Sequence, residues 1–101
     1  MAKRKHLPEE LDKEWLNHVV DELLLIFRFT GHHWMDDKQR LGRPDKHQIT
    51  AMIKMLYADY RNDTKCLSAS SGGIRISSNE GMPIVTYSQS ISFEHDVMPI
   101  D

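Results

Sequence analysis

The spacing of apolar residues changes once along this chain, and that change limits the fold more than any other feature. Up to about residue 61, apolar residues recur every three or four positions, which is the period of an amphipathic helix. From residue 74 onward they alternate with polar residues, as in a strand with one buried face. A chain of 101 residues has room for one core. We therefore expect one α+β domain over residues 8–101, preceded by a flexible basic arm over residues 1–7.

Two main helices are predicted in the first part of the chain. A proline followed by two glutamates at positions 8–10 is typical of a helix start, so the first helix should cover residues 8–29. The second should cover residues 45–61, because Asp45 and Gln48 stand three apart as in a capping box. The expected apolar stripes are Leu11, Trp15, Val19, Leu23 and Ile26 in the first helix, and Ile49, Met52, Ile53, Leu56 and Tyr60 in the second.

The last part of the chain predicts an antiparallel β-hairpin or small sheet that packs on the helices. Residues 65–73 are rich in serine and glycine, which is typical of a flexible linker. Residues 74–76 and 84–93 then alternate like two strands of unequal length, joined by turn residues at 79–81. The expected buried face of the longer strand consists of Val85, Tyr87, Ile91 and Phe93.

Half of the longer strand has no partner within such a hairpin. Exposed strand edges are normally paired or covered, and two strands alone are marginally stable. We expect the edge to be covered by the C-terminal tail, by residues 64–69, or by the same strand of a second copy in a homodimer.

The connector between the helices, residues 31–44, is longer than the roughly 2–8 residues usual for such a connection. A short third helix over residues 32–40 is one alternative for its structure. Three large apolar side chains stand in this polar segment, either to anchor it to the core or to form an exposed hot spot for a protein partner. The predicted partner-binding residues are Trp34, Met35, Arg40, Leu41 and Arg43.

The connector region also concentrates imidazole and carboxylate side chains, which are ligands that zinc or manganese accepts. If it were helical, His32 and Asp36 would face the same way, as would His33 and Asp37. A divalent metal held there would activate water in a metal-dependent hydrolase or nuclease. The H-E-x-x-H motif is absent, which weakens this alternative. Its candidate ligands are His32, His33, Asp36, Asp37 and His47.

A third alternative is a nucleic-acid-binding regulator that uses a local basic patch. The chain has 13 basic and 15 acidic residues and a net charge of −2, which excludes a broad positive field. Any nucleic-acid contact must therefore be local, with help from the basic N-terminal arm. The residues of this patch are Lys38, Arg40, Arg43 and Lys46.

The remaining features favour a non-enzymatic role without a cofactor. We find neither a nucleophile elbow nor a phosphate-binding loop. The single cysteine, Cys66, forms no intramolecular disulfide, which favours a cytoplasmic location. The longest apolar run, residues 23–27, is far below the ~20 residues that cross a bilayer. Our leading hypothesis is a small interaction or regulatory protein that binds a macromolecule, most simply a protein, through residues 31–47 and an exposed strand edge.

Overall fold

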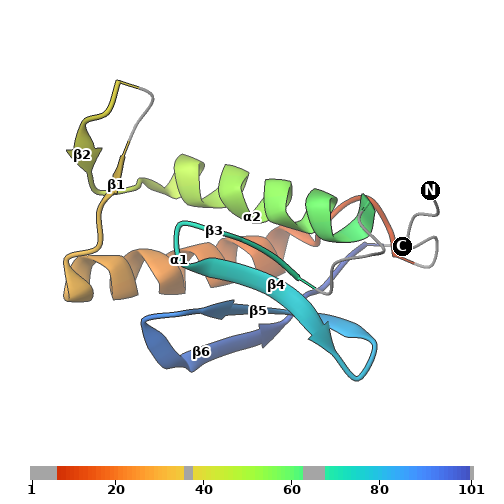
Figure 1. Ribbon diagram of the computed structural model, residues 1–101. Coiled ribbons are helices and arrows are strands. Elements are labelled where there is room, and N and C mark those ends of the chain that lie inside the picture. Colours follow the sequence, from red (N-terminus) through yellow and green to blue (C-terminus); the bar gives the residue numbers. More distant parts are fainter. Residues whose placement is uncertain (1–6, 36–37, 63–67, 101) are drawn as a thin grey trace.

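Two helices pack on one face of a four-stranded antiparallel sheet (Figure 1). The computed structural model describes residues 7–35, 38–62 and 68–100. The α+β class and the order of main helices before main sheet are confirmed, but a second, two-stranded sheet lies between the helices. The elements are α1 (Lys13–Thr30), β1 (Trp34–Met35), β2 (Leu41–Gly42), α2 (Lys46–Asn62), β3 (Ser68–Ser71), β4 (Ile74–Asn79), β5 (Met82–Tyr87) and β6 (Ser90–Asp96).

Helix α1 begins later than the sequence predicts, because the residues before it pair with the C-terminal tail. Leu11 forms an antiparallel bridge with Pro99, and the Asp12 N–H donates to the Met98 carbonyl at 2.8 Å. Asp12 is then the N-cap, and its side chain accepts a hydrogen bond from the Trp15 N–H at 2.8 Å. The prolyl and glutamyl residues at 8–10 therefore belong to an irregular segment before the helix.

This irregular segment before α1 is held against α2 as well. The Tyr57 hydroxyl donates to the Pro8 carbonyl at 2.6 Å, and the Arg61 Nε–H donates to the Leu7 carbonyl at 3.2 Å. Leu7, which the sequence assigns to the flexible basic arm, is buried in the core. Residues 1–6 of that arm lie outside the described residues.

Helix α2 begins as predicted. The Gln48 N–H donates to Asp45 Oδ1 and the Asp45 N–H donates to Gln48 Oε1, both at 2.8 Å, which is a reciprocal capping box. The helix then runs antiparallel to α1 (Figure 1). Its first turn contacts α1 through an ion pair, in which Lys46 Nζ lies 3.1 Å from Asp21 Oδ1.

The main sheet is a meander in the order β3-β4-β5-β6. The prediction of a flexible linker over residues 65–73 is wrong for Ser68–Ser71. These residues form β3, which pairs with β4 from Ser68↔Ser77 to Ser71↔Ile74. Part of the third strand expected at 64–69 is thus present, while residues 63–67 lie outside the described residues. Gly72 and Gly73 form the two-residue turn, with φ values of 62° and 86° that suit glycine in a tight hairpin.

The single long strand predicted over residues 84–93 is also wrong, because a turn at Ser88 and Gln89 divides it into β5 and β6. The polar alternation continues through this turn, so the local pattern conceals it. Tyr87 pairs with Ser90, and a register shift then places Thr86 opposite Glu94. Ile91 falls in the shifted segment and is fully exposed, at 103%, whereas the other three residues of the predicted buried face are buried: Val85, Tyr87 and Phe93.

The core lies between the helices and the sheet. Its largest fully buried side chains include Tyr57, Phe27, Phe93, Leu23 and Ile49, which come from both helices and from β6. Neither of the described helices has the length and apolar character needed to cross a membrane.

Replacement of Asp45 by alanine should lower the free energy of unfolding by about 1 kcal/mol, because the N-terminal amides of α2 lose an acceptor. Urea denaturation measures this change. Asp59→Ala is the control. Asp59 is exposed near the C-terminal end of α2, where a carboxylate is repelled by the negative end of the helix dipole, so its removal should not destabilise the helix. Equal destabilisation by the two variants would contradict the capping role of Asp45.

Candidate partner-binding groove

The connector between the helices forms a small β-hairpin. Strand β1 pairs antiparallel with β2, with Trp34 opposite Gly42 and Met35 opposite Leu41. The described residues of this connector hairpin, 34–35 and 38–42, project beyond the ends of the helices and away from the main sheet (Figure 1). Residues 36–37 lie outside the described residues. The short helix considered for residues 32–40 is wrong, because the left-handed Gly31 turns the chain out of α1 and cross-strand pairing follows.

Four aromatic rings fix the base of the connector hairpin. The His32 ring stacks on Phe27, with 4.7 Å between ring centroids, and the Trp34 ring meets Phe27 edge-on at 5.6 Å. On the other side of His32, its Nδ1 lies 2.7 Å from the Tyr87 hydroxyl. The cluster therefore joins the last turn of α1, the entry to β1 and the end of β5.

The turn between β3 and β4 completes this anchor. The Trp34 indole N–H donates to the Gly72 carbonyl at 3.2 Å. A Cβ on Gly72 would lie 2.8 Å from the Trp34 ring, and a Cβ on Gly73 would lie 2.8 Å from the Tyr87 ring. Both glycines therefore let an aromatic ring approach the backbone closely, in addition to forming the turn. Sequence reasoning missed them as site residues, although two adjacent glycines before an alternating strand were a usable signal.

Burial alters the titration of two members of the aromatic cluster. Loss of solvent lowers the pKa of His32, the charge of His33 lowers it further, and the Gly72 carbonyl raises it by less than burial lowers it. The pKa of Tyr87 is raised by burial. A neutral imidazole accepts at Nδ1 from the Tyr87 hydroxyl and carries its proton on Nε2. This Nε2 atom is buried, and among the described residues no hydrogen-bond partner lies within bonding distance of it, so His32 acts chiefly in packing.

Three neighbouring depressions surround the anchored hairpin. The first, about 370 Å³, is lined by all five residues that the sequence predicts for partner binding, together with Gly42 and Gln48. The second, also about 370 Å³, shares Trp34 and Met35 with the first. The third, about 450 Å³, shares Ser71 and Gly72 with the second and extends over the sheet to Arg75. We call these three neighbouring depressions together the connector groove.

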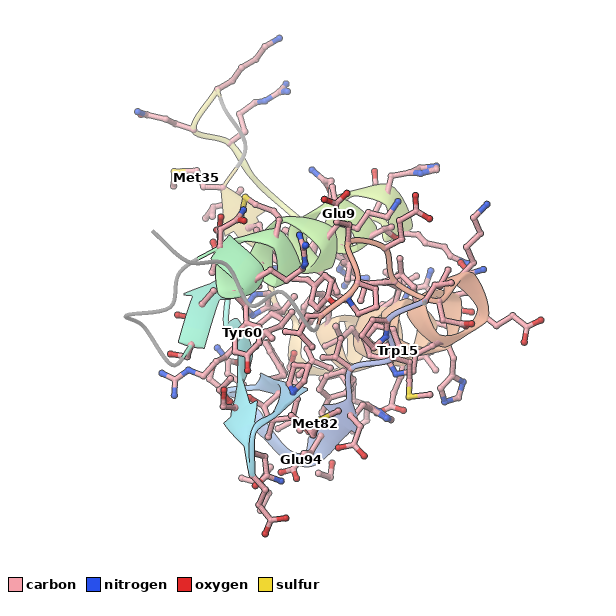
Figure 2. All side chains as sticks on the ribbon, turned by 90° about the vertical axis from the view of Figure 1, so that its right-hand side faces the viewer. Glu9, Trp15, Met35, Tyr60, Met82 and Glu94 are labelled. Carbon is pink, nitrogen blue, oxygen red and sulfur yellow. The ribbon has the colours of Figure 1, made fainter. Side chains whose placement is uncertain are left out.

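The connector groove is apolar near the hairpin and cationic toward both ends. Met35 and Leu41 are 60% and 69% exposed, and Figure 2 shows Met35 standing apart from the body of the molecule. The first depression carries Arg40 and Arg43, and the third carries Arg75. Among the described residues, no acidic side chain lines any of the three depressions. Such a surface complements an apolar group with negative charge beside it.

The histidines proposed as metal ligands have other surroundings. His32 lies in the aromatic cluster, His33 directs Nδ1 to the Gly31 carbonyl, and His47 is exposed in the first turn of α2. Asp36 and Asp37 lie outside the described residues. Within residues 7–35, 38–62 and 68–100, no three His, Cys, Asp or Glu side chains are placed to hold a metal ion.

The residues proposed for nucleic-acid binding separate into two places. Arg40 and Arg43 line one depression, and Lys38 is exposed on the connector hairpin. Lys46 instead lies in the first turn of α2 and contacts Asp21 of α1.

Comparison of this chain with protein-family models, with curated proteins and with solved structures finds no match.

Replacement of Gly72 by alanine should displace Trp34 from Phe27, because the new methyl group would overlap the indole ring. We expect Trp34 fluorescence to shift to longer wavelength in a Trp15→Phe background, where Trp34 is the only tryptophan left. Gly81→Ala is a matched control, since Gly81 has a φ of 84° but nothing within 4 Å of its Cβ position. In both variants the free energy of unfolding should fall by roughly 1–2 kcal/mol, because alanine is strained at a positive φ. An unshifted spectrum for Gly72→Ala would show that Trp34 is not held against this turn.

Acid should destabilise the protein through His32. Because burial lowers the folded-state pKa below the ordinary 6.5, the unfolded chain binds a proton at this residue at higher pH than the folded chain does. The contribution of neutral His32 to the free energy of unfolding is fully present above pH 6.5, and it is lost as the pH falls toward the folded-state pKa. Urea denaturation gives the free energy of unfolding at pH 7.5 and at pH 5.5. The difference between these two values should be smaller for His32→Gln than for wild type. His47→Gln, at an exposed site, should retain the wild-type difference; equal differences in all three proteins would contradict this role.

Proposed function

We propose that this protein is a small non-enzymatic interaction module, and that its connector groove binds an extended protein segment with a large apolar side chain flanked by acidic residues. The observation that supports this most directly is the meeting of the five predicted residues at one depression. Trp and Arg side chains are enriched at the energetic centres of protein interfaces. Exposed Met35 and Leu41 add apolar surface that gains free energy when it is covered.

The anchoring of the hairpin base favours binding. Trp34 is fixed by Gly72 and Phe27 before any partner arrives, so less conformational entropy is lost when the complex forms. The exposed side chains of the hairpin then extend a fixed platform instead of a loop that must first become ordered.

The charge of the groove favours an acidic partner, and its apolar centre favours a protein over a nucleic acid. Arg43 offers a planar donor fork suited to carboxylates, and Arg75 adds a second guanidinium in the depression over the sheet. Single-stranded nucleic acids are usually held by several stacked aromatic rings. The described lining of the three depressions has one tryptophan and two histidines, and the ring of His32 is already stacked on Phe27. We place this regulatory binding in the cytoplasm, which is consistent with a single cysteine.

Selection from a random-peptide display library tests the proposal. Peptides enriched on the wild-type protein should carry Asp or Glu around an aromatic or aliphatic residue. An Arg40→Ala/Arg43→Ala variant should bind them at least about tenfold more weakly, or ~1.4 kcal/mol, because both guanidinium groups are lost. Titration of Trp34 fluorescence in the Trp15→Phe background provides the affinities.

Lys54→Ala is the control for charge alone, since Lys54 lines a separate depression beside Leu11 and Tyr57. Its affinity for the selected peptides should match that of the wild type. Enriched peptides without acidic residues, or retention of single-stranded oligonucleotides in place of peptides, would contradict the proposal.

A further inference from the structure

We propose that two copies of this chain associate through the free edge of β6 and the adjoining face of α1, in an antiparallel, two-fold symmetric dimer. This surface is distinct from the connector groove. Strand β6 lies at the edge of the sheet opposite β3 and pairs within the chain with β5. β3, at the other edge, packs against α2.

Backbone groups of β6 point away from the sheet. The Val97 N–H donates to the Pro83 carbonyl at 3.0 Å, so this residue directs its backbone toward β5. In an antiparallel ladder the direction alternates, and Glu94 and Asp96 therefore direct their N–H and C=O groups outward. Such an edge can accept another strand.

Exposed apolar side chains lie along this edge. By helical periodicity, one face of α1 carries four side chains: His18, Glu22, Leu25 and Phe29. Because the Glu22 carboxylate lies 3.2 Å from His95 Nε2, this face runs beside β6. Leu25 is 64% exposed and Phe29 is 94% exposed.

The fully exposed Ile91 lies toward the same end of the surface. Figure 1 shows α1 and β6 running in opposite directions. From the contact between Glu22 and His95, seven residues along α1 cover ~10 Å and reach Phe29. Four residues back along β6 cover ~13 Å in the same direction and reach Ile91. The apolar patch and the free strand edge are therefore neighbours.

The charges on β6 fit a second copy of β6 in one arrangement. The first half of the strand, Ser90–Ser92, is uncharged, whereas the second half contains Glu94 and Asp96. Antiparallel pairing centred on Phe93 places Glu94 opposite Ser92 of the second copy, and Asp96 opposite its Ser90. Parallel in-register pairing, or antiparallel pairing centred on Glu94, would place carboxylates directly opposite each other, which is destabilising.

The same two-fold axis would bring the α1 faces together. Phe93 lies about 7 Å from His95 along β6, and Leu25 lies about 4.5 Å from Glu22 along α1, so both are close to the axis. Each copy would then contribute the same patch to a self-complementary interface.

Sedimentation velocity of the full chain over micromolar to submillimolar concentrations tests this proposal. Wild type should be a dimer, and Leu25→Glu and Ile91→Glu should each raise the dimer dissociation constant by at least about tenfold, because both changes place a carboxylate in the interface. Both side chains are largely or fully exposed, so the fold should be retained, as judged by circular dichroism. Leu41→Glu, at a 69% exposed apolar residue of the connector groove, is the matched control and should remain dimeric.

Hydrogen exchange gives a second readout at residue resolution. The amides of Glu94 and Asp96 should be protected in wild type at high concentration and should lose protection in Leu25→Glu. A wild-type monomer throughout the concentration range would overturn the proposal. So would a dimer that tolerates both Leu25→Glu and Ile91→Glu, or one that Leu41→Glu dissociates.

Discussion

The contact between the Trp34 indole and the Gly72 backbone is the constraint on which the functional geometry depends. It joins a connector between two helices to a turn of the sheet that lies 38 residues further along the chain. His32 fills the space between Phe27 and Tyr87 behind it. Without these contacts the connector would be a polar loop of free orientation, and its exposed methionine, leucine and arginines would define no common surface. Packing of the aromatic cluster thus converts a flexible segment into a platform.

The two proposed surfaces divide the molecule. The connector groove lies around the β1–β2 hairpin and the β3–β4 turn, whereas the self-association surface lies along β6 and the outer face of α1. A dimer built on the latter would leave both grooves accessible. Two linked sites bind a repeated or bivalent partner more tightly than one site does, when the spacing permits both to engage.

Local signals in the sequence predicted local structure well. The capping box at Asp45 and Gln48 and the turn at residues 79–81 are features of neighbours in sequence, and both are present. The apolar stripe predicted for the first helix is right in part, because Val19 and Leu23 are buried in α1 whereas Leu11 lies before the helix. The predicted connector residues also converge on one depression, because they lie close together in the chain.

Features that depend on distant pairing were missed. The segment before α1 is not helical, and it pairs with the distant residues 98–100, which no local pattern indicates. The turn at Ser88 was hidden because small polar residues alternate with apolar residues on both sides of it in the sequence, although Ile91 is exposed in the structure.

The pairing of Leu11 with Pro99 also affects how the chain must be built. Residues 98–100 lie far from residues 10–12 in sequence, so their pairing closes a long loop and costs more chain entropy than contacts between neighbouring elements do. The nascent helices can form and meet earlier, since their contacts are closer in sequence. The pairing of residues 10–12 with residues 98–100 should therefore be a late step of folding, after the helices have met.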